Sequence, residues 1–161
     1  MLRRFRETAP AALVPFAWTV VVAAHLDTVS SHAIFVAHVV MSLLLATFAV
    51  TGWRDMSDGV LRVWRTTVVV GFGATALGVV GFVVDADPLL SVSLYAWMAL
   101  PALGLLYTGR AVGDSAPYLG GGVAALLGVG VYAAAPSLAV AGLGLVGVGQ
   151  TAGIVDAVVR Y

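Results

Sequence analysis

The fold class of this chain is decided by stretches such as HAIFVAHVVMSLLLATFAVTG, residues 32–52, which contain no Asp, Glu, Lys or Arg. A helix needs about 20 mainly apolar residues to cross the hydrocarbon core of a bilayer. Comparable apolar runs recur from end to end of the 161-residue chain. Such stretches predict several helices that cross a membrane.

Composition supports the same interpretation. Hydrophobic residues make up 61% of the chain and charged residues 10%, and the mean hydropathy is +1.03. Soluble domains carry roughly 25% charged residues, because polar groups cover their surfaces. We therefore predict an all-α fold, a polytopic membrane helix bundle that forms one integral membrane domain over residues 1–161 and contacts the lipid bilayer.

Turn signals divide the chain into six expected transmembrane helices. Asp58-Gly59, Asp87-Pro88 and Pro136-Ser137 each favour a break between apolar runs. The expected helices cover residues 10–26, 32–52, 62–84, 88–107, 118–134 and 137–159.

Basic residues predict the orientation of these helices. With six crossings and a cytoplasmic N-terminus, every arginine falls in a cytoplasmic segment, as positively charged loops generally do. Both termini are then cytoplasmic. The chain has no Lys or Asn and is rich in Ala, Val, Gly, Arg and Asp, which is typical of GC-rich genomes. We expect the cell membrane of a prokaryote. The eight basic residues are Arg3, Arg4, Arg6, Arg54, Arg62, Arg65, Arg110 and Arg160.

Residues 1–24 allow a second interpretation. They combine a basic start, an apolar run and a Val-x-Ala ending, which is the pattern of a cleaved signal peptide. Cleavage would leave five transmembrane helices in the same orientation.

Glycines in the last expected helix predict a packing face. Gly149 and Gly153 form a Gly-x-x-x-Gly pair, and Gly142 lies seven residues earlier on the same side. Small residues let membrane helices approach closely. We expect contact along this face, within the bundle or in a homo-oligomer.

Three histidines fall in one short part of the chain. His25, Asp27 and His32 lie near one membrane surface, where they form a candidate metal site; histidines on adjacent helices can also bind haem. The alternative, which we favour, is hydrogen bonding to water at the surface without a cofactor. His38 lies deeper, and ionisable groups inside a bilayer usually face the bundle interior or a cavity.

Three further residues join His38 as candidates for a transport pathway. Pro101 removes an amide that would bond the carbonyl of Trp97, and transporters line cavities with such interrupted helices. Gln150 lies in the middle of the last helix, where it either joins helices or lines a pathway.

No catalytic constellation is found. The chain has no cysteine, no His-Glu-x-x-His and no phosphate-binding loop, so we predict that it is not an enzyme. Its zero net charge predicts no nucleic-acid partner. The function predicted is that of a transporter or channel-like protein, or a subunit of one, for a small solute or ion. The alternatives are a non-catalytic accessory or assembly subunit that binds other membrane subunits, and a redox subunit with haem or metal at the histidines.

Overall fold

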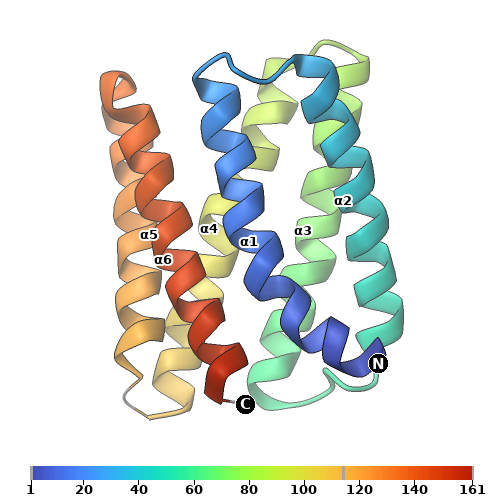
Figure 1. Ribbon diagram of the computed structural model, residues 1–161, viewed down its shortest axis with the longest axis vertical. Helices are drawn as coiled ribbons and strands as arrows, with labels where there is room; N and C mark the ends of the chain where they lie inside the picture. The colour runs from blue at the N-terminus through green and yellow to red at the C-terminus, as the bar shows by residue number, and fades with distance from the viewer. Residues whose placement is uncertain (1, 114, 161) are drawn as a thin grey trace. The chain divides into compact units, whose positions relative to one another are not determined.

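The computed structural model describes residues 2–113 and 115–160, with side chains over 11–113 and 115–159. Those residues are almost entirely helical and include no strand, which confirms the predicted all-α fold (Figure 1). The elements are α1 (Leu2–His25), α2 (Ser31–Gly52), α3 (Gly59–Val83), α4 (Asp87–Ala111), α5 (Ala116–Ala134), the 3-10 helix η1 (Pro136–Leu138) and α6 (Ala139–Arg160).

Five of these elements are long and apolar enough to cross a membrane: α2, α3, α4, α5 and the segment Pro136–Val159. This indicates a multi-pass membrane protein. In α1 the described side chains begin at Ala11 and include the apolar stretch Ala11–His25, and a sixth crossing stays a prediction. Hydropathy placed the start of α3 at residue 62 and the end of α4 at residue 107. The helices run on to Gly59 and Ala111 because helical hydrogen bonds continue into polar sequence beyond the apolar core.

The chain forms two compact units. Unit 1 contains Met1–Val29 and Pro101–Tyr161, and unit 2 contains Ser30–Leu100. The second boundary lies inside α4, so this helix gives its first half to unit 2 and its second half to unit 1.

Unit 1 is built on the close approach of α5 and α6, which run side by side in Figure 1. Gly121 lies against Gly149, and Gly128 lies against Gly142. A Cβ atom at Gly128 would lie 2.5 Å from the carbonyl oxygen of Gly142, and a Cβ atom at Gly142 would lie 2.8 Å from the nitrogen of Tyr132. The two backbones therefore touch where no side chain separates them. The other face of α6 packs on α1.

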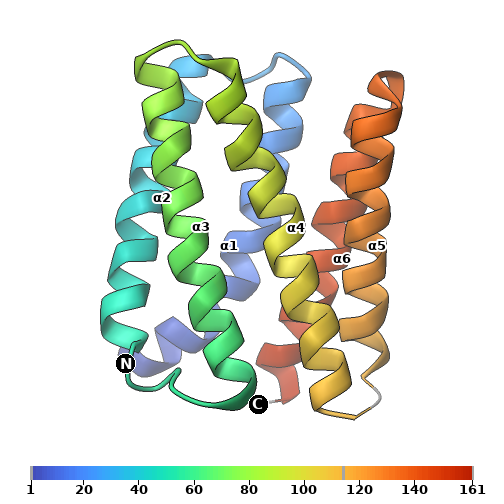
Figure 2. The same ribbon diagram turned by 180° about the vertical axis from the view of Figure 1, so that it is seen from behind.

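Unit 2 is organised around one face of α3, which Figure 2 shows with α2 and α4. The buried residues of this face are small and recur at helical spacing. Larger side chains from α2 and α4 fill the space above them, such as Leu90 over Gly81. The buried residues of α3 are Thr67, Gly71, Ala74, Thr75, Gly78 and Gly81.

Polar residues lie at several of the turns, where they cap the start of a helix or follow its last residue. The hydroxyl of Ser30 accepts a hydrogen bond from the amide of Ala33 and caps α2. Asp27 and Asp85 follow α1 and α3 with φ of 54°. This left-handed conformation closes a helix through a bond five residues back, here from the amide of Thr28 to the carbonyl of Ala23. Asp is among the few side chains other than Gly that tolerate it.

Replacement of Gly149 by Ala tests the contact between α5 and α6. The added methyl group would meet the backbone of Gly121 and lie 2.9 Å from the amide nitrogen of Ala125. We expect the free energy of unfolding to fall by about 1–3 kcal/mol, because backbone cannot move aside as a side chain can. Thermal unfolding in detergent measures the change.

Gly144→Ala is the matched control, since a Cβ atom there would meet nothing within 4 Å. It should leave stability unchanged or raise it by up to about 1 kcal/mol, because Ala favours helix more than Gly does. Equal effects of the two substitutions would contradict the proposed backbone contact.

Candidate functional site

His38 is the half-buried imidazole of unit 2. Its Nδ1 atom lies 3.0 Å from the carbonyl oxygen of Ile34, one turn earlier in α2. A carbonyl can only accept, so Nδ1 carries a hydrogen and donates. In the neutral ring Nε2 then has a lone pair available for a proton or another donor.

The imidazole of His38 lies over Gly78 of α3, beside Ser93 of α4. From the position of a Cβ atom on Gly78, the distances are 2.7 Å to Cδ2 of His38, 3.0 Å to its Nε2 and 2.9 Å to Oγ of Ser93. Phe82 meets the ring edge to face, with centroids 5.2 Å apart. An imidazole and a hydroxyl from two helices therefore share the space that the missing Cβ atom leaves on a third.

Trp97, a candidate pathway residue, is held by its packing on α3. Its six-membered ring lies over Gly71, 2.7 Å from the position of a Cβ atom there. Its Nε1–H donates to the hydroxyl of Thr75 over 2.8 Å, and that hydroxyl donates to the carbonyl of Gly71 over 2.8 Å. His38 and Trp97 thus contact the same face of α3. The glycines beneath them, Gly78 and Gly71, are seven residues or about 10 Å apart along the helix.

Gln150, another candidate pathway residue, joins two helices of unit 1. Its side chain is 2% exposed, and its Oε1 accepts a hydrogen bond of 2.9 Å from Nε1 of Trp18 in α1. Gly147 lies one turn before Gln150 and leaves room for the side chain of Trp18. A Cβ atom added at Gly147 would lie only 3.0 Å from the Cβ atom of Trp18. This is the arrangement expected of a polar residue that joins membrane helices.

The four candidates are divided between the units, His38 and Trp97 in unit 2 and Pro101 and Gln150 in unit 1. A polar cavity that joins all four stays a prediction. Pro101 is the first residue of unit 1 after the boundary in α4. The glycines predicted to form a packing face all lie in unit 1, where Gly153 meets Leu105 of α4.

The candidate metal residues are also divided, since His25 and Asp27 belong to unit 1 and His32 to unit 2. His25 has partners at both ring nitrogens: the carbonyl of Val21 lies 2.9 Å from Nδ1 and the hydroxyl of Tyr132 lies 3.0 Å from Nε2. A metal at His25 would have to displace one of them. Within each unit, the side chains that the structure describes gather no three His, Asp or Glu residues around a common point.

No protein family, curated protein or solved structure matches the chain. Function therefore rests on the chemistry of the contacts within each unit.

Sequence reasoning did not single out Ser93 or Trp18. The recurrence of small residues along α3 from Gly71 to Gly81 is a signal for the face on which His38 lies. Nothing in the spacing of α4 distinguishes Ser93 from Ser91.

A double-mutant cycle on Trp18→Phe and Gln150→Leu tests the bond between α1 and α6. Trp18→Phe removes the donor of this buried hydrogen bond, so we expect a loss of about 1 kcal/mol of unfolding free energy. The coupling between the two substitutions should be about 0.6 kcal/mol and at most about 1.7 kcal/mol, as for other membrane-helix bonds. Unfolding in detergent gives all four stabilities.

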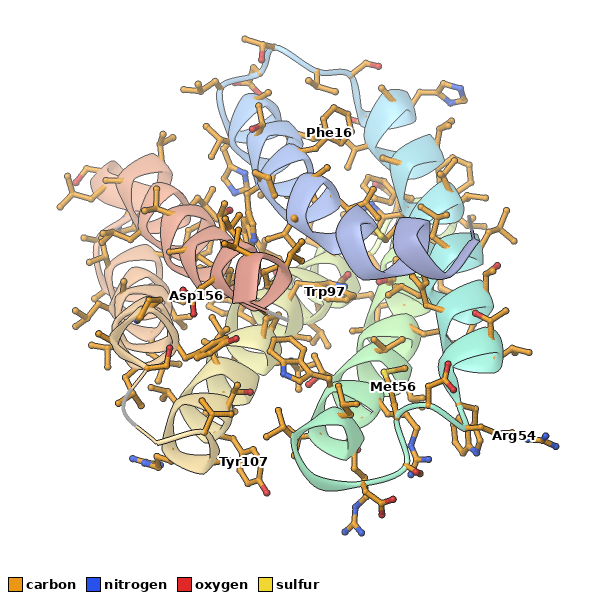
Figure 3. All side chains as sticks on the ribbon, turned by 60° about the horizontal axis from the view of Figure 1, so that its bottom comes forward. Phe16, Arg54, Met56, Trp97, Tyr107 and Asp156 are labelled. Carbon is orange, nitrogen blue, oxygen red and sulfur yellow. The ribbon has the colours of Figure 1, made fainter. Side chains whose placement is uncertain are left out.

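Phe16 supplies the control for this cycle, because it lies on the same helix with 67% of its side chain exposed and is drawn in Figure 3. Phe16→Leu and Gln150→Leu should have additive effects. A coupling of the same size in both cycles would show that the Trp18 bond contributes nothing specific.

Proposed function

We propose that this chain is a small membrane transporter that carries protons, alone or together with a small solute, and that His38 binds and releases the proton. The observation that carries the proposal is the place of its imidazole, half buried in unit 2 against Gly78 of α3. Ionisable residues within membrane helices are rare and usually belong to ion or proton pathways. Histidine side chains serve as proton carriers in many proteins because one ring nitrogen can bind a proton and release it again.

Ser93 supports this role because its hydroxyl lies beside the same imidazole. A hydroxyl can both donate and accept. Nε2 of His38 and the buried Oγ of Ser93 therefore place two polar atoms from different helices beside Gly78.

The boundary at Pro101 supports movement between the two units. Pro101 cannot donate to the carbonyl of Trp97, so α4 lacks one of its stabilising bonds where unit 2 gives way to unit 1. Helices bend at such positions. Transporters alternate access by moving one group of helices against another around interrupted helices.

The proposal includes a location and an orientation. All eight basic residues fall in the segments that are cytoplasmic when six helices cross with the N-terminus inside. We place the protein in a prokaryotic cell membrane with both termini in the cytoplasm. No catalytic step and no haem or metal cofactor forms part of the proposal.

A second candidate function is that of an accessory subunit in a membrane complex. It is favoured by Trp97 and Gln150, whose polar atoms hold helices together. It is favoured also by α2, where only Leu45 and Gly52 are buried. A partner chain that copurifies with the protein at constant stoichiometry would support this function over the first.

His38→Gln tests the transporter. Purified protein in liposomes with an internal pH-sensitive dye should dissipate an imposed proton gradient faster than empty liposomes do. The variant should reduce the rate to that of empty liposomes, because glutamine cannot carry a proton. His32→Gln is the control, since His32 is exposed in the first turn of α2. Wild-type protein that is no faster than empty liposomes, or a fully active His38→Gln variant, would refute the proposal.

Gly78→Ala tests the same site without removing the imidazole. The new methyl group would lie 2.7 Å from the ring of His38, so the ring has to move from α3. Proton flux should fall severalfold, while Gly73→Ala should keep the wild-type rate because a Cβ atom there meets nothing within 4 Å. Unchanged flux in Gly78→Ala would mean that the position of the ring on α3 does not matter for transport.

A further inference from the structure

A groove runs along the second half of α2. At its wider end it is an open hollow with a volume of about 690 Å³. A second hollow of about 340 Å³ continues it toward the middle of α2 and shares Val50 and Thr51 with the first. The wider end is lined by Ala49, Val50, Thr51, Trp53, Arg54, Asp55 and Val69. All of them belong to unit 2.

The wall along α2 suits a hydrocarbon chain. The second hollow is lined by Ala46, Thr47, Val50 and Thr51. The two hydroxyls there are already bonded within α2, that of Thr47 to the carbonyl of Leu43 over 2.8 Å and that of Thr51 to the carbonyl of Thr47 over 2.7 Å. The surface that remains is methyl and methylene groups.

The wider end of the groove is also mainly apolar, and its aromatic wall is in contact with a charged side chain. The guanidinium of Arg65 lies 4.5 Å from the ring centroid of Trp53, and its Nη1 donates to the Trp53 carbonyl over 3.3 Å. Trp53 is 51% exposed, as tryptophans at the level of lipid headgroups are. Arg54 is exposed, and Figure 3 shows its side chain directed away from the helices.

We propose that this groove binds an anionic phospholipid. One acyl chain lies along residues 46–51, and the phosphate binds the guanidinium of Arg54 next to Trp53. Arginine suits this role because its planar group forms two parallel hydrogen bonds with a phosphate. Basic positions between membrane helices are known places for acidic headgroups.

A lipid fits this surface better than a partner helix does. The groove joins an apolar trough to a cation at one end, and a phospholipid has the same two parts in the same order. Around that end Arg54, Asp55 and Arg65 have a net positive charge, which favours an anionic headgroup over a neutral one. This inference does not depend on the proposed transport function.

The test compares two exposed arginines, one that lines the groove and one that lies outside it. Arg54 lines it, whereas Arg62 is an exposed arginine of α3 that does not. Native mass spectrometry of the full chain in detergent, titrated with phosphatidylglycerol or phosphatidylcholine, measures lipid affinity. Wild-type protein should prefer phosphatidylglycerol about tenfold, and Arg54→Gln should lose this preference, since one charged hydrogen-bonding group contributes about that much. Arg62→Gln should keep it.

A substitution that fills the groove provides the second measurement. Val50→Trp puts a large ring into both hollows from a position that is 78% exposed, so the fold is not disturbed. It should weaken binding of both lipids severalfold. Val40→Trp, on the same helix, lies outside both hollows and should bind as wild type does.

Three results would overturn the proposal. Equal losses in Arg54→Gln and Arg62→Gln would mean attraction by overall charge with no site. Unchanged binding in Val50→Trp would place the lipid elsewhere. A dimer in the mass spectrum that Val50→Trp abolishes, with no lipid preference in the wild type, would assign the groove to a second copy of the chain.

Discussion

Close approach of backbones is the constraint on which this fold depends. Lipid tails are as apolar as the side chains of the helices, so burying Val or Leu between two membrane helices gains little over leaving it in lipid. Association then comes from dense packing and from the few polar contacts available. In unit 1 the glycines of α5 and α6 meet each other directly. In unit 2 the small residues of α3 instead receive rings from its neighbours, with Trp97 over Gly71 and His38 over Gly78.

The two units use one device in common, a tryptophan whose ring packs beside a glycine and whose N–H reaches a polar group on another helix. Trp18 lies by Gly147 and donates to Gln150 in unit 1. Trp97 lies over Gly71 and donates to Thr75 in unit 2. An indole N–H has no water to bond within a bilayer, so it needs such a partner. The glycine sets the depth of the ring, and the hydrogen bond sets its orientation.

Hydropathy alone predicted the helices, because the bilayer imposes one length and one kind of side chain on every crossing. It placed helix ends a few residues short where polar sequence stays helical, as at Gly59 and Ala111. Spacing indicated which side of α6 carries its glycines, yet it could not name α5 as the neighbour, because a helical pattern gives a direction and no partner. The bond of Gln150 to Trp18 was out of reach for the same reason.

Within the candidate site, His38 could be picked out because it is an ionisable residue inside an apolar run. Ser93 could not, since its importance comes only from lying beside His38 over Gly78. A contact among three helices is a property of the packing. No single segment of sequence contains it.

Unit 1 is discontinuous along the chain, and this has a consequence for how the protein is made. Trp18 and Gln150 are 132 positions apart, and all of unit 2 is synthesised between them. At a synthesis rate of about 5–20 residues per second, Gln150 is added on the order of ten seconds after Trp18, and until then α1 lacks its partner on α6. During that interval α2, α3 and the first half of α4 are already complete. Contacts within unit 1 between α1 and α6 can therefore form only after every residue of unit 2 has been synthesised.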